Sequence, residues 1–511
     1  MMKLPHYKLG IDVGGTTVDL VVIDSTGYLV KSCKIPLTDG IENCIIKGIK
    51  QLFQDESIQP QNCLSIHIGT TIALNSLLEI SSLYKVGLLR IAGHYPDVPP
   101  AYEFPARQRQ AILTSFETIS GGREVDNQAI SILDRVSIID AIDKLLGAGT
   151  EAIGIISVFS PLYSEDEIYA ENIIRQHFGE DIVLTLSSQL GGLGFIEREN
   201  NTLVNTALKK VMKKSFAFLA ATCKQLGFQC DYFITQNNGT LISLEEAVNF
   251  PLKTLCSGAT NSLIGASKLA GLSHAIMVDI GGTSTDIGIV ENSFPRTTFK
   301  LANIGGIPLN FHLPDISVLA LGGGSIINEL AITDQSLGYR VFSESRSVGG
   351  EHLTLFDIGN LLNNKVTENN IRITSPEADM LMKKCLEKIS HTANELACGL
   401  KLPVVLVGGG AETIPDYFLN DEIIRPAHFG IANAYGAALA EISGVLDQIV
   451  YLDKNVEETL YELEQRVIQK VIAKGAAPGS VRLIEKTLLP LYYMPNQMTR
   501  VVMVAAGILG M

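Results

Sequence analysis

One short pattern occurs twice in this chain and constrains its fold more than any other feature. It is an apolar run, an aspartate, a Gly-Gly-Thr turn and a second aspartate, and its copies are Gly10–Asp19 and Val278–Asp286. More apolar residues follow each copy, at Leu20–Ile23 and Ile287–Val290. Apolar runs on both sides of a glycine turn predict two buried strands joined by a tight hairpin. One such hairpin is common, but two copies predict a duplicated α/β domain that grips one ligand from two sides.

Both turns have the residue types that hold a phosphate. Their glycines let backbone N–H groups point outward without a Cβ in the way, and the Thr and Ser hydroxyls add further donors. We expect the two turns to face each other across a cleft and to hold the β- and γ-phosphates of one nucleotide. The candidate phosphate-binding residues are Gly14, Gly15, Thr16, Thr17, Gly281, Gly282, Thr283 and Ser284.

The leading aspartate of each copy, Asp12 or Asp279, stands where the strand opens into the turn. From this position a carboxylate can hold Mg²⁺ through water. Phosphoryl transfer depends on positioning and charge neutralisation, so both aspartates are candidate metal ligands and candidate catalytic residues. Capping of the hairpin is the alternative role. Asp19 and Asp286 are expected to form hydrogen bonds within their hairpins.

Later strands also end in glycine or polar residues, which is where α/β proteins place ligands. Ser317–Ser325 and Pro403–Ala411 each run into three glycines, which predict a flat floor for adenine and ribose because a side chain there would block the base. The candidate floor residues of the second segment are Gly408, Gly409 and Gly410. The strands in Leu64–Asn75 and Tyr232–Gly239 supply the candidate substrate residues Thr70, Thr71, Asn237 and Asn238. Capping of the following helix is the alternative role for the two threonines.

Composition excludes several other classes of protein. The 511 residues carry a formal net charge of −14 and no Lys/Arg-rich run, which argues against nucleic-acid binding. The eight cysteines are scattered without a Cys-x-x-Cys pair, a pattern typical of free thiols in a reducing compartment. We expect no signal peptide, no membrane span and a cytoplasmic location. No Ser-His-Asp set or His-x-x-x-His pair stands out, and His67 is expected to be a core residue.

Three segments allow two interpretations each. Residues 93–122, rich in proline and containing Arg107 and Arg109, are a surface insertion that is either a solvated loop or a lid. The long helix predicted over 196–226 begins with polar residues that either contact substrate or tie the two halves together. A helix after Asn455, with an expected capping box to Glu458 and an apolar stripe over Val456–Val471, either packs on its own domain or docks a partner. Two strands are expected to follow it, around a turn at Pro495.

These motifs together resemble the superfamily of sugar kinases, heat-shock ATPases and actin. Within it, the chain is similar to the hydantoinase A/5-oxoprolinase family over roughly residues 8–450. The matching segments, in the order of the family, are Gly10–Asp19, Gly69-Thr-Thr with Asn75, Thr235–Gly239, Ser257-Gly-Ala, Val278–Asp286 and Leu321–Ser325.

The resemblance implies an α/β fold in which two ribonuclease H-like (actin-like ATPase) domains surround a nucleotide cleft. We expect them over residues 1–195 and 196–450, followed by an α+β appendage over 451–511. The resemblance also implies an ATP- and Mg²⁺-dependent hydrolase that phosphorylates the carbonyl oxygen of a cyclic amide, such as 5-oxoproline or a hydantoin, before water opens the ring. Such proteins act with a B-type subunit, and a homo-oligomer is a second expectation. A small-molecule kinase and a nucleotide-switched regulatory ATPase are the alternatives.

Overall fold

Two sheets share one strand pattern, which confirms the predicted duplication. In each, a hairpin and a third antiparallel strand continue into two strands parallel to the first. In the first sheet these strands are β3 (Leu29–Pro36), β2 (Thr17–Asp24), β1 (Tyr7–Val13), β4 (Cys63–Thr70) and β9 (Asp231–Thr235). In the second they are β18 (Ile316–Leu319), β12 (Thr285–Glu291), β11 (Ala275–Ile280), β21 (Val404–Val407) and β22 (Ile423–Ile424). The register is also repeated, because Asp12 lies opposite Asp19 and Asp279 lies opposite Asp286.

The structure is a computed structural model. It describes residues 6–38, 40–54, 58–93, 97–298, 301–311, 313–419, 422–452, 455–492 and 498–510. Among the helices of these segments, none is long and apolar enough to cross a membrane.

The first sheet continues beyond β9 with strands from much later in the chain. Its full order is β24-β25-β23-β10-β9-β4-β1-β2-β3. The added strands are β10 (Leu241–Ser243), β23 (Ile442–Tyr451), β24 (Arg482–Pro490) and β25 (Met498–Gly507). The sheets therefore divide the chain at other points than 195/196 and 450/451, because β9, β10, β23, β24 and β25 all belong to the first sheet. Local sequence patterns do not show pairing between strands so far apart.

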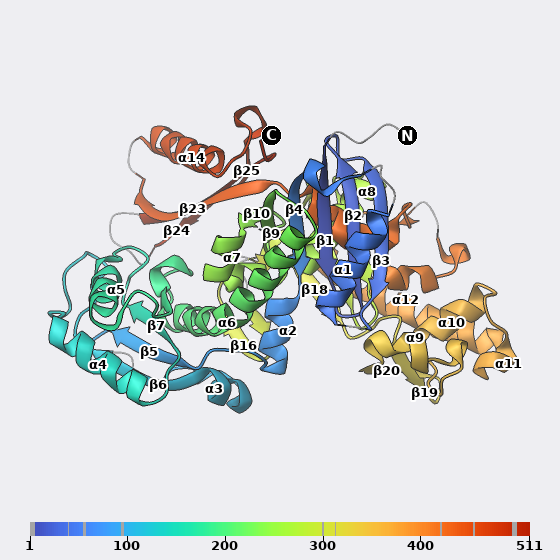
Figure 1. Ribbon diagram of the computed structural model, residues 1–511, viewed down its shortest axis with the longest axis horizontal. Coiled ribbons are helices and arrows are strands. Elements are labelled where there is room, and N and C mark those ends of the chain that lie inside the picture. Colours follow the sequence, from blue (N-terminus) through green and yellow to red (C-terminus); the bar gives the residue numbers. More distant parts are fainter. Residues whose placement is uncertain are drawn as a thin grey trace.

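Helix α14 (Val456–Ala473) packs on this C-terminal extension (Figure 1). Its residues Leu460, Leu463, Val467 and Val471 are buried in one cluster with residues of β23 and β25, so the stripe packs on its own unit. The expected capping box does not form at its start, where the Asn455 side chain donates to the Glu458 carboxylate instead. The expected turn at Pro495 lies outside the described residues.

A separate parallel sheet includes one strand from the segment interpreted as a loop or lid. Its order is β6-β5-β7-β8, and helices α4 (Arg135–Gly147) and α5 (Glu165–Phe178) pack in its core. The strands are β5 (Val86–Ile91), β6 (Leu113–Ile119), β7 (Ala152–Ser157) and β8 (Leu184–Leu186). Both interpretations of residues 93–122 were wrong, since the segment forms α3 (Ala106–Ile112) and then β6, which pairs with β5. The prolines and arginines of this segment favoured an irregular loop, although part of it forms a regular helix and strand.

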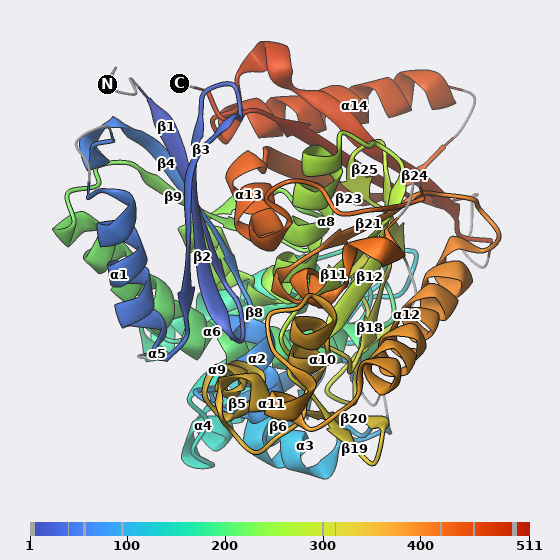
Figure 2. The same cartoon turned by 90° about the vertical axis from the view of Figure 1, so that its right-hand side faces the viewer.

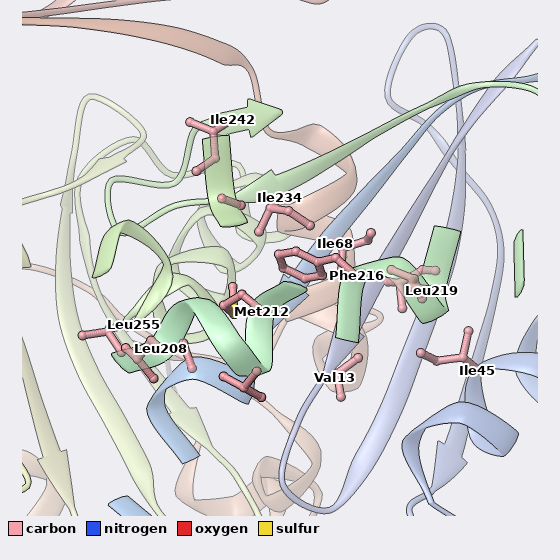
Figure 3. Close-up of a cluster of buried hydrophobic side chains, with 14 of the residues drawn as sticks. Val13, Ile45, Ile68, Leu208, Met212, Phe216, Leu219, Ile234, Ile242 and Leu255 are labelled. Carbon is pink, nitrogen blue, oxygen red and sulfur yellow. The ribbon is translucent and has the colours of Figure 1, made fainter. Parts of the chain in front are cut away.

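Helix α6 (Phe195–Gln225) links this small sheet to the first large one. Its first turns carry buried polar residues, as predicted, and these tie elements together. Arg198 donates to the carbonyl of Ser157 and to the bend before α6, and Asn200 donates to Pro308 O at 3.0 Å. Glu199 forms a buried ion pair with Arg90 at 2.6 Å. Farther along the helix, Phe216 lies next to Ile68 in the core beneath the first turn (Figure 3).

Two helices cross between the large sheets (Figure 2). Helix α8 (Ser257–Ala270) packs on β11, β12 and β21, whereas α13 (Ala432–Leu439) packs on β1, β2 and β4. A Cβ on Gly265 would collide with the carbonyl of Ala432, and one on Gly436 would collide with the carbonyl of Asn261. The close packing of these two helices therefore rests on the two glycines.

Candidate functional site

The two glycine turns are closed in the same way and meet each other. Gly14 N–H donates to Thr17 O at 3.0 Å, and Gly281 N–H donates to Ser284 O at 2.8 Å. A Cβ on Gly282 would lie 2.7 Å from Cγ2 of Thr16, so the turn of the second half touches the turn of the first. The expectation that the turns face each other is confirmed by this contact.

A third glycine segment, Gly322–Gly324, packs against the second turn and donates hydrogen bonds to it. Gly323 N–H donates to Gly281 O at 2.9 Å, and Gly324 N–H donates to Gly282 O at 2.7 Å. A Cβ on Gly322 would lie 2.7 Å from the carbonyl carbon of Gly282. Gly322 and Gly324 are therefore required by close backbone approach to the turn, and the role of adenine floor for this segment stays a prediction.

Each leading aspartate is buried beside a glycine of the neighbouring parallel strand. Asp12 pairs in register with Gly69, and a Cβ on Gly69 would lie 2.7 Å from Oδ1 of Asp12. Asp279 lies opposite Val407, and a Cβ on the following residue, Gly408, would collide with Oδ1 of Asp279. Gly408 also has a φ of +86°, which L side chains rarely adopt. The glycines at these strand ends leave room around the two carboxylates.

The carboxylates raise one another's pKa. Asp12 is 4% exposed, and burial, with the negative charges of Asp19 and Asp279, raises its pKa to about 7. Burial also raises the pKa of Asp279, and burial together with Asp279 raises the pKa of Asp286 to about 7. Within the described chain, Oδ1 of Asp12 accepts no hydrogen bond, while Oδ2 accepts a long one from Asn433 at 3.5 Å. A buried, unpaired carboxylate oxygen among like charges is suited to a cation.

Two residues of this site, Lys34 and Asn433, were not predicted from the sequence. Lys34 forms an ion pair with Asp19 at 2.5 Å and donates to Gly430 O at 2.9 Å, so Asp19 bonds to the third strand in addition to its hydrogen bond with Thr17 of its own hairpin. Asn433 reaches Asp12 from the start of α13. The alternation along β3 could have indicated Lys34 once its register with β2 was known. No local pattern distinguishes Asn433.

The four candidate substrate residues lie in two places. Thr71 Oγ1 donates to Val13 O at 3.2 Å, and Thr70 is buried at the same sheet edge as Asp12. Asn237 donates to Leu252 O at 3.0 Å and accepts from Cys256 N–H at 2.8 Å, whereas Asn238 accepts from Thr240. The two asparagines therefore hold loops, and they line a separate cavity of about 480 Å³.

Other predicted features can be checked directly. His67 is fully buried, contacts Ser65 and Ala437 O through its two ring nitrogens, and has its pKa lowered to about 3 by burial, which confirms a core role. The described residues contain no group of three or more His, Cys, Asp or Glu side chains that could hold a metal ion. A Mg²⁺ ion at the turns would thus have two aspartates and the nucleotide as its ligands, which is the usual composition of such sites.

Comparison with known proteins agrees with this architecture. The family model described as hydantoinase/oxoprolinase matches residues 198–414, and that of the hydantoinase/oxoprolinase N-terminal region matches residues 8–178. The caprolactamase subunit alpha of Pseudomonas jessenii is 27% identical over 96% of this chain and 73% of its own length. The acetophenone carboxylase gamma subunit of Aromatoleum aromaticum is 25% identical over 67% of this chain and 50% of its own length.

Two solved structures have the same fold. The ATP-dependent caprolactamase from Pseudomonas jessenii superposes with a TM-score of 0.73 at 19% identity, covering 98% of this chain and 87% of that one. Nucleotide-free acetone carboxylase gives a TM-score of 0.69 at 16% identity, covering 98% and 88%. The two family models together span most of the chain, in the order in which its duplicated turns occur. The chain belongs to the hydantoinase/oxoprolinase family.

Proposed function

We propose that the two facing turns bind one Mg-ATP and that the chain uses it to activate the carbonyl of a cyclic amide for ring opening. The chain is an ATP-dependent cyclic amidase of the hydantoinase/oxoprolinase type. The observation that carries the proposal is the contact between Gly282 and Thr16, which joins two phosphate-type turns at one place and puts a buried aspartate behind each.

The residues of this site suit the nucleotide and its metal. The backbone N–H groups of the turns Gly14–Thr17 and Gly281–Ser284 that do not close the turns would hold the phosphates, and Gly408–Gly410 would form the floor under adenine and ribose. Asp12, with its unpaired Oδ1, and Asp279 would hold Mg²⁺. When bound, Mg²⁺ would neutralise charge on the phosphates and orient them.

The role of the protein in phosphoryl transfer is then positioning and charge stabilisation. N–H groups fixed by the two closed turns stabilise charge on the transferred phosphoryl group without reorganising. The amide oxygen of the substrate attacks the γ-phosphorus, and ADP leaves. Thr70 and Thr71, which lie at the sheet edge next to Asp12, would contact the ring. The O-phosphorylated carbonyl carbon is more electrophilic, so water adds to it and the ring C–N bond breaks as the nitrogen takes up a proton. The acyl phosphate formed in this way is hydrolysed by a second water to the carboxylate and inorganic phosphate.

Product analysis tests the reaction class. We expect ADP, inorganic phosphate and ring-opened product in equal amounts when a panel of lactams, hydantoins and 5-oxoproline is supplied with Mg-ATP and the complete enzyme. ADP with phosphate retained on a stable product would make the chain a small-molecule kinase. Slow ATP cleavage that no ring compound accelerates would make it a regulatory ATPase. Separate assays for ADP and phosphate distinguish the three.

A second subunit is the other part of the proposal. The caprolactamase and acetophenone carboxylase relatives are both named as subunits. We infer that a B-type subunit of this family supplies the group that activates water, since the site described above contains aspartates committed to Mg-ATP. A second copy of this chain is the alternative partner.

The isolated chain is therefore expected to bind Mg-ATP but to open 5-oxoproline or hydantoin rings slowly or not at all. Calorimetry with Mg-ATP serves as the control that the isolated chain is folded and competent. Ring opening at a rate typical of enzymes by the isolated chain would refute the need for a partner. Size-exclusion chromatography with light scattering shows in the same preparation whether a second copy is bound.

A further inference from the structure

A cavity of about 480 Å³ lies under the C-terminal extension of the first sheet. It is bounded by α14, β23 and β25 on one side and by the bend at 188–192 on the other. These segments, red and cyan to green in Figure 1, lie on the side of the molecule away from β2 and β3. None of the described residues of the two glycine turns lines this cavity, so it is a site apart from the proposed nucleotide site.

The side chains that line this cavity carry a net positive charge, opposite in sign to the net charge of the whole chain. Five basic side chains and two carboxylates line it, although the chain as a whole carries −14. Three of the basic residues, Arg466, Lys470 and Lys474, are spaced four apart along α14 and so share one helix face. Like charges four residues apart destabilise a helix by a few tenths of a kcal/mol per pair. Their placement around a cavity indicates that an anion offsets this repulsion.

The two carboxylates are already committed to three of the cations. Glu246 accepts from both Lys253 and Lys474, each at 2.8 Å. Asp447 accepts two hydrogen bonds from Arg500, at 2.8 and 2.6 Å. The backbone of the bend at 188–192 lies close to Arg500, because a Cβ on Gly192 would lie 3.0 Å from its guanidinium.

Arg466 and Lys470 have only neutral acceptors among the described residues. Arg466 donates to the side-chain oxygen of Gln448 at 3.3 Å, and Lys470 donates to Val445 O at 2.9 Å. Partial burial and the neighbouring charges of Lys474 and Lys253 lower the pKa of Lys470, an effect that the Glu246 carboxylate partly offsets. Two cations without a carboxylate partner, one guanidinium and one ammonium, therefore face the cavity.

The rest of the lining is partly apolar. Leu252, Phe311 and Val502 contribute apolar surface to the same cavity. A ligand that satisfies both parts has one carboxylate and a compact hydrocarbon body. We propose that this cavity binds a small organic carboxylate, with Arg466 and Lys470 as its anchors and the apolar side chains around its body. The proposal goes beyond the nucleotide-dependent reaction and does not depend on it.

Calorimetry on the nucleotide-free chain tests this site with probes that contain no amide to be activated. The probes are cyclopentanecarboxylate, the neutral cyclopentylmethanol and inorganic phosphate. We expect the carboxylate to bind at least ten times more tightly than the alcohol or phosphate. Arg466→Gln and Lys470→Gln should each raise the Kd for the carboxylate at least fivefold. Lys486→Gln, on neighbouring β24 and outside the cavity, should leave it unchanged.

Equal affinity for the carboxylate and the alcohol, or equal affinity of the Arg466 and Lys470 variants and the wild type, would overturn the proposal. Phosphate binding as tightly as the carboxylate would refute the role of the apolar lining. Absence of carboxylate binding at millimolar concentration would also overturn it. Both anchors are exposed side chains, and circular dichroism with thermal melting confirms that each variant is folded.

Discussion

Replacement of Asp12 by asparagine is expected to stabilise the ligand-free chain and to abolish ATP turnover. The folded chain raises the pKa of Asp12 to about 7 from an ordinary value of 3.8. The unfolded chain therefore loses this proton first, and stability falls as pH rises between these two values. Above pH 7 the carboxylate costs on the order of 3–4 kcal/mol, an upper bound that asparagine removes. Turnover should fall at least about a hundredfold, because an electrostatic partner of the phosphates is lost.

Thermal melting of both proteins from pH 4 to pH 8, with and without Mg-ATP, measures these effects. The gain in Tm of Asp12→Asn should be small at pH 4 and largest near pH 8. Mg-ATP should raise the Tm of the wild type only. Asp24→Asn is the matched control, because the Asp24 carboxylate on β2 accepts hydrogen bonds from Thr26 and Tyr28 and its pKa is lowered. That variant should lose stability slightly. A pH-independent difference for Asp12→Asn, or retained turnover, would refute the assignment.

The largest loss of stability is expected from Gly265→Ala or Gly436→Ala. Each added methyl would collide with a backbone carbonyl of the other helix where α8 and α13 cross. Neither helix can yield easily, since α13 is pressed on the first sheet, where a Cβ on Gly10 would also collide with the carbonyl of Ala434. We expect each variant to lose about 3 kcal/mol or more of unfolding free energy, at the upper end for overpacking.

Urea unfolding followed by circular dichroism measures this loss. Gly147→Ala is the control, because Gly147 ends α4 and no atom lies within 4 Å of its added Cβ. That variant should be neutral or gain up to about 1 kcal/mol through the lower entropy of its unfolded chain. A Gly265 or Gly436 variant as stable as the wild type would show that the helices are not in close contact.

The sequence predicted the parts of this fold that depend on local patterns. Apolar runs around glycine turns located both hairpins, and the helix predicted over 196–226 lies within one residue of α6. It missed the pairing of β23 with β10, which is decided by the sheet edge that β10 leaves open and not by anything within residues 442–451. It also missed α3 and β6, where prolines and arginines outweighed a short apolar run.

The same distinction holds for the candidate site. Asp12 and Asp279 could be predicted because strand, aspartate and turn are contiguous, and the glycines beside them because each ends its own strand. Lys34 and Asn433 reach the site only through register and helix packing. Asn237 and Asn238 followed from the strand-end rule, yet the structure commits their side chains to loops. The end of a strand predicts where a ligand can bind. It does not predict which polar side chains there are free of hydrogen bonds within the protein.

The order of strands in the first sheet has a consequence for how the protein is made. β10 ends at Ser243, and its partner β23 begins at Ile442, about 200 residues later. At ribosomal rates of 5–20 residues per second, the edge of β10 waits roughly 10–40 s for that partner to be synthesised. An uncovered strand edge pairs readily with other chains, so nascent protein is most vulnerable to aggregation in this interval. Slow translation of residues 244–441 would lengthen this interval, which is when a chaperone that binds nascent chains would protect the edge of β10.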